Sequence, residues 1–516
     1  MAAAVQQRPI ALRAGVCLAI AGAAGWLALR LGPAEDGYFD SAFYLDGARH
    51  LALGDGYVSA VAPADSRTYA PVIRWAPAFS ALMAVAIRAG GLSPPAAASL
   101  VVGASYVVSI AAVFLLGLEL FGRRHVFASL LAAALFAIQP STLDNLNALL
   151  SDLPFAAIAL LNTLWAVRLS RAAPASRGAL VAFGGALAIM VLARYAGALY
   201  IPGLLLALAI AMARQERPLW EIARAQFFIA LSFSAGVVVW VVRNRQYGPE
   251  PFGERTLQDG RILPELGRAL HGAFTWWLDV SGICEELGAA RWVRLGTLVA
   301  LGCVLVLAFG RSRARDGLLF TWLPASAYLL AMALLAARMH FDPLNSSRFW
   351  VSIWPLMFLS MLSLCAGAEA LWQRVPAALL GLTLLGALFA YGHDLQEELP
   401  GARLKRGLLS ESWRRAAQML PESSECRLFV MDARPFMLHR MLGPTSDIPQ
   451  AIEDIDRSLQ NYPAVCLAVL HKRLHLSAGA ERQRPREMQL VHELIARGRT
   501  QLWHSGEGVT VYRLLP

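Results

Sequence analysis

Charged residues and cysteines are scarce in this sequence. Asp, Glu, Lys and Arg make up 16% of its 516 residues, whereas soluble domains carry about 25%. The six cysteines are too few and too scattered for a disulfide framework, and none forms a CxxC pair. These shortages argue against a soluble protein and exclude a small disulfide-stapled fold.

Several motifs that would indicate a mechanism are also missing. The sequence has no HExxH zinc motif, no GxSxG nucleophile motif and no P-loop, so nothing in it indicates a zinc protease, a serine hydrolase or an ATP-driven pump. It has no RNA- or DNA-binding motif either. The net charge of +10 is therefore better explained by basic cytoplasmic loops than by a nucleic-acid partner.

Long apolar runs are abundant, and hydrophobic residues make up 57% of the chain. A span needs about 20 apolar residues, and about eleven runs come near that length. These runs are residues 10–31, 97–121, 126–143, 153–169, 178–193, 197–213, 226–242, 292–309, 317–336, 349–367 and 376–392. The first run is read as a retained span because a poor cleavage site follows it. The shorter run 76–92 predicts a juxtamembrane or re-entrant helix. The fold class predicted is a polytopic α-helical membrane protein.

The arginines predict an orientation. Cytoplasmic loops are enriched in Lys and Arg. If the N-terminus is cytoplasmic, every alternate loop is basic, from Arg123 to Arg374. Three larger segments then lie outside: residues 32–96, 243–291 and the tail from 393. We therefore predict a membrane domain at 1–392, with outer loops at 32–96 and 243–291, and an extracytoplasmic domain at 393–516 in a multi-pass protein of the cell membrane.

The tail predicts a small α/β domain. Strands are expected in the stretches CRLFVMDAR, AVCLAVLH and GVTVYRLL, and a helix in EMQLVHELIARG. Cys426 and Cys466 lie in two of these strands. An oxidising outer side would permit a bond between them.

The first outer segment carries three acids: Asp36, Asp40 and Asp46. If residues 40–51 are helical, Asp40, Phe43, Tyr44 and Gly47 share one face. Asp40 then lies at the N-terminal edge of this helix, where a carboxylate can act as general base toward a hydroxyl or amine. The alternatives are a solvated loop acid or a helix N-cap, and Asp36 fits these better.

Two further acids, Asp144 and Asp152, bracket the outer ends of the third and fourth spans. An ionisable group at or inside a span is costly and indicates function by default. Asp152 is therefore a candidate catalytic residue. The alternative is a cap on a helix that begins at Pro154.

Arginines at outer span ends break the positive-inside pattern. They are Arg74, Arg194, Arg243, Arg245, Arg338 and Arg348. Each alone could simply extend its side chain to the membrane surface, but their recurrence on several hairpins favours a common anionic partner such as phosphate or pyrophosphate. His340 stands alone, without the spacing of a metal ligand.

At this point the order of parts resembles the GT-C superfamily of polytopic glycosyltransferases, which use polyprenyl-phosphate sugars. Protein mannosyltransferases, aminoarabinose transferases and rhizobial lipopolysaccharide-core transferases belong to it. The segment Asp40–Tyr44 resembles the family's acidic-aromatic motif, and GARHLALGDGY, RWAPAFSALMAVAIRAGG, LLSDLPFAAIALL, RYAGALYIPGLLLAL, RNRQYG and SRFWVSIWPLMFL are similar to its later motifs. The resemblance covers about residues 10–392.

The resemblance implies roles for single residues. Asp40 would be the catalytic base or position the acceptor, and Asp152 would be a supporting acid. The substrate-binding residues would be Tyr44, Arg74, Arg194, Arg243 and Arg348, with the arginines on the lipid phosphate. Ser41 stands where the family often has a second acid, which argues against metal binding there. The resemblance leaves a divalent metal open and implies no other cofactor.

The sequence thus predicts a membrane glycosyltransferase. It would move a sugar from a polyprenyl-phosphate carrier to a lipid, glycan or protein acceptor on the extracytoplasmic face, within the bilayer and without nucleic acid. A transporter or flippase of an anionic lipid-linked substrate is the alternative, although charges at span ends rather than at midplane favour the enzyme. A third interpretation is a non-catalytic assembly partner that binds through its tail.

Overall fold

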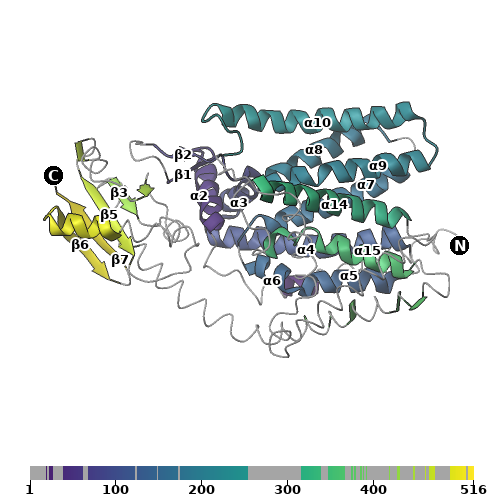
Figure 1. Cartoon of the computed structure of the whole chain (residues 1–516), viewed down its shortest axis with the longest axis horizontal. Coiled ribbons are helices and arrows are strands. Elements are labelled where there is room, and N and C mark those ends of the chain that lie inside the picture. The colour runs from purple at the N-terminus through teal and green to yellow at the C-terminus, as the bar shows by residue number, and fades with distance from the viewer. Residues whose placement is uncertain are drawn as a thin grey trace. The chain divides into compact units, whose positions relative to one another are not determined.

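In the computed structural model the chain divides into two compact units (Figure 1). Unit 1 comprises Met1–Gly32, Val101–Asn147 and Ser151–Gly401, and unit 2 comprises Pro33–Leu100, Ala148–Leu150 and Ala402–Pro516. Apart from a few short pieces, the structure describes residues 39–61, 68–122, 125–147, 149–172, 175–253, 315–338, 347–366, 427–430, 445–447, 464–470, 488–506 and 509–515. The domain boundary expected after residue 392 stays a prediction.

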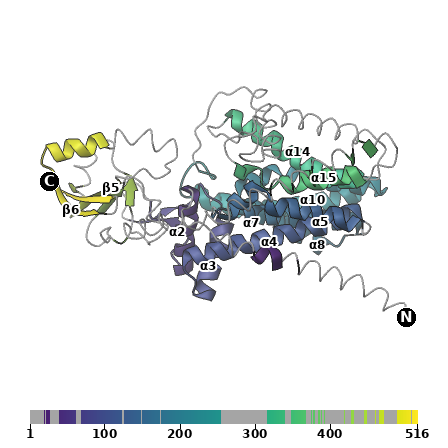
Figure 2. The same cartoon turned by 90° about the horizontal axis from the view of Figure 1, so that it is seen from below.

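Unit 1 is a bundle of helices. Figures 1 and 2 show its long members running side by side. The helices are α4 (Pro94–Phe121, which begins in unit 2), α5 (Val126–Ile138), α6 (Pro140–Asn147), α7 (Asp152–Arg171), α8 (Arg177–Ala193), η2 (Tyr195–Leu199), α9 (Ile201–Arg214), α10 (Leu219–Arg245), α14 (Arg315–Arg338), η3 (Ser347–Phe349) and α15 (Trp354–Ala366).

Five of the described helices are long and apolar enough to cross a membrane. A sixth span results if α5 and α6, which bend by 56° at Gln139, count as one. The prediction of a helical membrane protein with several spans is therefore confirmed. The total of about eleven spans stays a prediction, since the runs 10–31, 292–309 and 376–392 lie largely outside the described residues.

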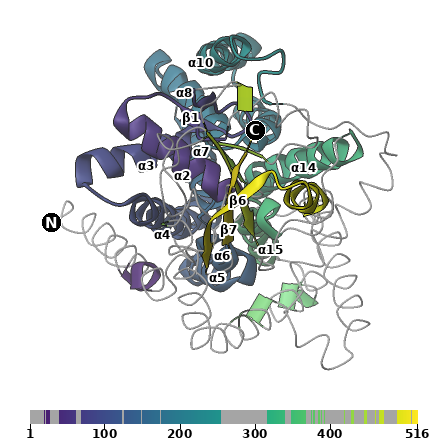
Figure 3. The ribbon, with the colours of Figure 1, turned by 90° about the vertical axis from the view of Figure 1, so that its left-hand side faces the viewer.

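Helix α7 is the most enclosed of these five candidate spans. Of its most apolar stretch, 78% is buried, compared with 11% for α10. Figure 3, which looks along the bundle, shows α7 among the other helices and α10 at the margin. An apolar helix at the margin keeps its side chains toward lipid, whereas an enclosed one packs against other helices over most of its surface. Polar groups on α7 are therefore held in fixed positions.

Helices α8 and α10 approach closely because Gly184 has no side chain. A Cβ atom there would lie 2.4 Å from the carbonyl oxygen of Ile229 on α10. We expect Gly184→Ala to destabilise the bundle by about 1–3 kcal/mol, the usual cost of overpacking. Thermal melting in detergent measures this loss. Gly185→Ala is the matched control, because its Cβ would meet only Ser232 Oγ, at 3.8 Å. Equal melting temperatures for the two variants would contradict the prediction.

Unit 2 begins with helix α2 (Phe39–Leu53), which packs against α3 (Pro77–Gly90). Between them the short strands β1 (Val58–Ser59) and β2 (Ala70–Pro71) pair antiparallel. Gly47 is required in α2 because a Cβ would lie 2.6 Å from the ring of Tyr57. The helix expected at 76–92 is thus present, and its relation to the membrane stays a prediction.

The rest of unit 2 contains a five-stranded sheet in the order β4-β3-β5-β7-β6. The strands are β3 (Arg427–Val430), β4 (Thr445–Asp447), β5 (Val465–Leu470), β6 (Thr500–Gly506) and β7 (Val509–Leu514). Strand β3 runs parallel to β4 and β5, and β7 runs antiparallel to β5 and β6. A helix at residues 488–496 precedes β6. Strands β3, β5 and β7 and this helix lie where the sequence predicted them, whereas β4 and β6 were not predicted.

Cys466 on β5 is disulfide-bonded. Cys426 lies outside the described residues, so the pairing of these two cysteines stays a prediction. The same holds for the extracytoplasmic position of the tail and for its independence as a domain.

Candidate active site

The first residue of α7, Asp152, is the acidic centre of a charged cluster in unit 1. Ser151 is the N-cap of the helix, and the Asp152 carboxylate is directed to two arginines. Arg194 Nη1 donates a hydrogen bond to Oδ1, and Arg348 Nε forms an ion pair with Oδ2 at 3.4 Å. The side chain of Asp152 is 1% exposed. A carboxylate buried to this degree requires opposite charge, and the two arginines supply it.

The local backbone structure places both arginines next to Asp152. Arg194 follows α8 in extended conformation (φ −158°, ψ 127°), where the chain turns into η2. Arg348 lies in the single turn of η3, which packs against α6. Both guanidinium groups also lie near the ring of Phe349, at 5.0 and 5.8 Å from its centroid, a geometry that favours cations.

Among Asp152, Arg194 and Arg348 themselves, two positive guanidinium groups face one carboxylate. Their side chains are 11% and 18% exposed, so water screens this charge only weakly. Guanidinium groups bind phosphate oxygens in bidentate fashion. The arrangement can therefore hold an anion next to a carboxylate.

Arg243 belongs to the same unit, at the end of α10. Its guanidinium donates to Asn244 Oδ1 at 2.8 Å and lies over the rings of Trp240 and Tyr247. Trp240 in turn donates its indole N–H to the hydroxyl of Tyr195, which follows Arg194 in the chain. Aromatic residues thus connect the α10 end to the turn that carries Arg194.

Asp40 lies in unit 2, in the first turn of α2, and the helix predicted there is confirmed. Its Oδ1 accepts a hydrogen bond of 3.0 Å from the indole N–H of Trp75. The indole stacks on Phe43, with ring centroids 3.9 Å apart and an angle of 12° between the planes. Two helical positions on one face of α2 therefore hold a carboxylate and the ring that orients its donor. Trp75 was not among the predicted site residues.

Two other predicted residues of unit 2 differ in character. The guanidinium of the exposed Arg74 lies 5.7 Å from the ring of Trp75. Tyr44 is 4% exposed and packs edge-on against Phe79, so the structure gives it a packing role. Its contact with substrate, like that of Arg74, stays a prediction. Asp144 on α6 is exposed, and Asp36 and His340 lie outside the described residues.

A second buried acid, Asp46 on α2, was not predicted as a site residue. Its Oδ2 accepts hydrogen bonds from the backbone N–H of Ala60 at 2.7 Å and from Ser59 Oγ at 3.0 Å. Its Oδ1 lies 3.9 Å from His50 Nε2, and His50 Nδ1 bonds Asp55 Oδ2 at 2.9 Å. These contacts fasten the strand β1 to α2. The spacing of Asp46 and His50, four residues apart on a helix, was the available signal.

Burial raises the pKa of the Asp46 carboxyl above its usual value of 3.8, although its hydrogen bonds and the charges of Arg49 and His50 oppose this. The folded state then holds this proton more tightly than the unfolded state. Stability contributed by Asp46 is full below pH 3.8 and is lost as the pH rises through the raised pKa.

We expect Asp46→Asn to abolish this loss. The amide stays neutral at every pH, and its oxygen can still accept from Ala60. When thermal melting is followed from pH 4 to pH 8, the melting temperature of the variant should therefore rise relative to that of the parent as the pH increases. Asp55→Asn, at a partly exposed acid, serves as the comparison. A difference between parent and variant that does not change with pH would contradict the assignment.

Among the described residues, no group of three or more His, Cys, Asp or Glu side chains is placed to hold a metal ion.

Solved structures resemble this chain in fold. ArnT from Cupriavidus metallidurans bound to undecaprenyl phosphate aligns over 97% of both chains with a TM-score of 0.52 and 14% identity. The Archaeoglobus fulgidus oligosaccharyltransferase in complex with Zn and sulfate gives a TM-score of 0.52 at 13% identity, over 87% of this chain and 67% of the other. The chain shares the fold of these structures. The predicted resemblance is thus confirmed at the level of the fold.

A third structure agrees. AglB from Archaeoglobus fulgidus, in complex with an inhibitory peptide and a dolichol-phosphate, aligns over 96% of this chain and 74% of its own with a TM-score of 0.50 and 11% identity. No protein-family model and no curated protein matches the sequence.

Proposed function

We propose that this protein is an integral membrane glycosyltransferase that moves a sugar from a polyprenyl-phosphate carrier to an acceptor on the extracytoplasmic face. The observation that carries the proposal is the likeness in fold, over 97% of both chains, to ArnT bound to undecaprenyl phosphate. The likeness to AglB in complex with a dolichol-phosphate adds a second structure that contains a lipid phosphate. Both support a lipid-linked donor.

In this reaction Arg194 and Arg348 bind the phosphate of the carrier lipid. When a sugar leaves its carrier, negative charge develops on the phosphate, and oriented guanidinium groups stabilise that charge. The Asp152 carboxylate holds both arginines in place. Asp152 is then a positioning residue, and Arg243 of the same unit is assigned to the same anion. Contact of Arg74, in unit 2, with the substrate stays a prediction.

The proposal assigns proton removal from the acceptor to Asp40. A carboxylate can take a proton from a hydroxyl or amine as the new bond to the sugar forms. Its orientation comes from Trp75, whose indole N–H donates to one carboxylate oxygen. The acceptor is a lipid, a glycan or a protein.

Transfer of labelled sugar in proteoliposomes tests the function. The purified protein is given a panel of synthetic polyprenyl-phosphate sugars together with lipid, glycan and peptide acceptors. We expect transfer from at least one donor and its loss in Arg194→Gln/Arg348→Gln. A panel without any transfer, combined with movement of a lipid-linked anion across the vesicle membrane that the same double variant abolishes, would establish the transporter or flippase instead.

A further inference from the structure

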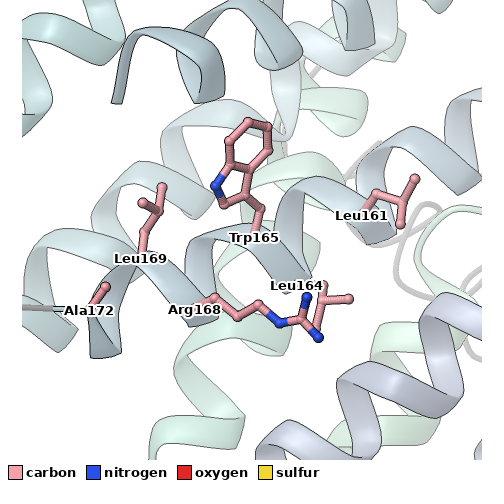
Figure 4. A pocket seen from close by; sticks show the side chains of 6 residues that line it. All are labelled: Leu161, Leu164, Trp165, Arg168, Leu169 and Ala172. Atoms are coloured by element: carbon pink, nitrogen blue, oxygen red, sulfur yellow. The ribbon is translucent and has the colours of Figure 1, made fainter. Parts of the chain in front are cut away.

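A groove runs along the second half of α7, away from Asp152. It has a volume of about 520 Å³ and is lined by Leu161, Leu164, Trp165, Arg168, Leu169 and Ala172 (Figure 4). The spacing of three and four residues places these side chains on one stripe of the helix. Five of the six are apolar, and Arg168 is the exception.

Neighbouring helices of unit 1 border the stripe on both sides. The ring of Trp165 meets Phe183 of α8, with centroids 5.6 Å apart. On the other side, Arg168 Nε donates to Glu119 Oε1 of α4 at 3.3 Å. The groove therefore lies on α7 between α4 and α8. Leu161 in the groove and Val181 on α8 are large exposed apolar residues, as expected where a helix bundle faces lipid.

Near the charged end of the groove, positive groups outnumber negative ones among the residues that the structure describes. Arg168 and Arg171 share the single carboxylate of Glu119, which accepts from Arg171 Nη1 at 2.8 Å. Arg217 adds a third guanidinium, which donates to the carbonyl oxygen of Ser170 at 2.8 Å. The side chains of Arg168 and Arg171 are 55% and 45% exposed. Both can therefore reach an anion from outside the bundle.

The length of the groove fits one leaflet of a bilayer. The stretch from Leu161 to Ala172 is roughly 16 Å long at 1.5 Å per residue, and half of the hydrocarbon core is roughly 15 Å. A soluble anion would use only the arginines and leave the apolar stripe empty. A molecule with both an acyl chain and an anionic head would use the whole groove.

We infer that this groove binds an anionic glycerophospholipid. One acyl chain lies along the α7 stripe, and the phosphate is held by Arg168 and Arg171. Arginines at a helix end and an apolar groove beside them form the kind of basic pocket that selects anionic head groups. A zwitterionic lipid binds less well there, because its positive group meets the same arginines. The site is separate from the Asp152 cluster and does not rest on the proposed transfer reaction.

Tryptophan quenching by brominated lipids tests the site, because bromine atoms on an acyl chain quench only nearby indoles. The full chain is reconstituted in phosphatidylcholine, which is replaced stepwise by brominated phosphatidylcholine or brominated phosphatidylglycerol of equal chain length. We expect the phosphatidylglycerol to bind about fivefold more tightly, the effect of one basic residue near a head group. In Trp165→Phe this extra quenching should disappear.

Charge variants then identify the head-group contact. Arg168→Gln/Arg171→Gln should bring the two lipids to equal affinity. Arg177→Gln is the matched control, because Arg177 begins α8 and lies over Phe228 instead; it should keep the preference. If the double variant does not fold, the single variant Arg168→Gln takes its place. Native mass spectrometry then counts the phosphatidylglycerol molecules bound to this variant and to the parent. The variant is expected to retain fewer.

Three results would overturn the inference. They are equal quenching by the two lipids in the parent, a preference that survives in the arginine variants, and displacement of the quenching lipid by a small amount of polyprenyl phosphate. The last result would make the groove a site for the carrier lipid. Because no sugar transfer is measured, failure of the proposed function leaves each of these outcomes unchanged.

Discussion

Asp152→Asn is expected to lower the free energy of unfolding by about 3–5 kcal/mol, the usual cost of removing one partner from a buried ion pair. The amide can still accept the hydrogen bond from Arg194, but it carries no charge. Arg194 and Arg348 then face each other around Phe349 without the carboxylate that balances one of them. Denaturant titration in detergent, compared with the parent, measures the loss.

Glu119→Gln provides a matched control for this loss. Glu119 also binds two arginines, Arg168 and Arg171, but its side chain is 29% exposed. Exposed ion pairs contribute about 0–1 kcal/mol. Each variant therefore removes one carboxylate charge that contacts two arginines. The two sites differ in how deeply that carboxylate is buried. If Asp152→Asn lowers the free energy of unfolding no more than Glu119→Gln does, the buried cluster contributes less to stability than expected here.

The double variant Asp152→Asn/Arg194→Gln separates charge balance from chemistry. It returns the charge summed over Asp152, Arg194 and Arg348 to its value in the parent, so most of the lost stability should come back, as a double-mutant cycle measures for residues in contact. Sugar transfer should not come back, because one of the two guanidinium groups assigned to the phosphate is gone. If both stability and sugar transfer recovered, the cluster would have a structural role and would not bind the phosphate.

The sequence predicts the helices well because a span is a local property. A run of apolar residues long enough to cross a bilayer forms a helix whatever its neighbours, since lipid offers no other partners to the backbone. Each apolar run in the described part of unit 1 coincides with a helix. Strand β6 (TQLWHSG) escaped prediction because four of its seven residues are polar and its partner is β7.

The site is harder to predict because its contacts join distant segments. Asp152 was chosen as an acid near a span, and Arg194 and Arg348 as arginines on the wrong side of the charge pattern that could share an anionic partner. That all three would meet depends on how α7, α8 and η3 pack, which no local pattern contains. The residue that donates a hydrogen bond to Asp40 was missed for the same reason, because Trp75 lies 35 positions further along the chain.

Asp40→Asn is expected to reduce sugar transfer by about 10²–10⁴-fold, the range that general-base catalysis supplies. The amide oxygen can still accept from the indole N–H of Trp75, so the stacking of Trp75 on Phe43 is expected to persist. Folding should therefore change little, in contrast to Asp152→Asn. The measurement is the initial rate of transfer in proteoliposomes, with melting temperature recorded in parallel.

Asp36→Asn is the control for this experiment, because it removes the same charge four residues earlier in the sequence, where a solvated loop acid is expected. It should keep full transfer. The comparison isolates proton removal from general electrostatics: a loss in both variants would indicate that overall negative charge attracts the substrate. Full transfer by Asp40→Asn would contradict the assignment of Asp40 as base, while leaving the anion site at Arg194 and Arg348 to be judged by its own variants.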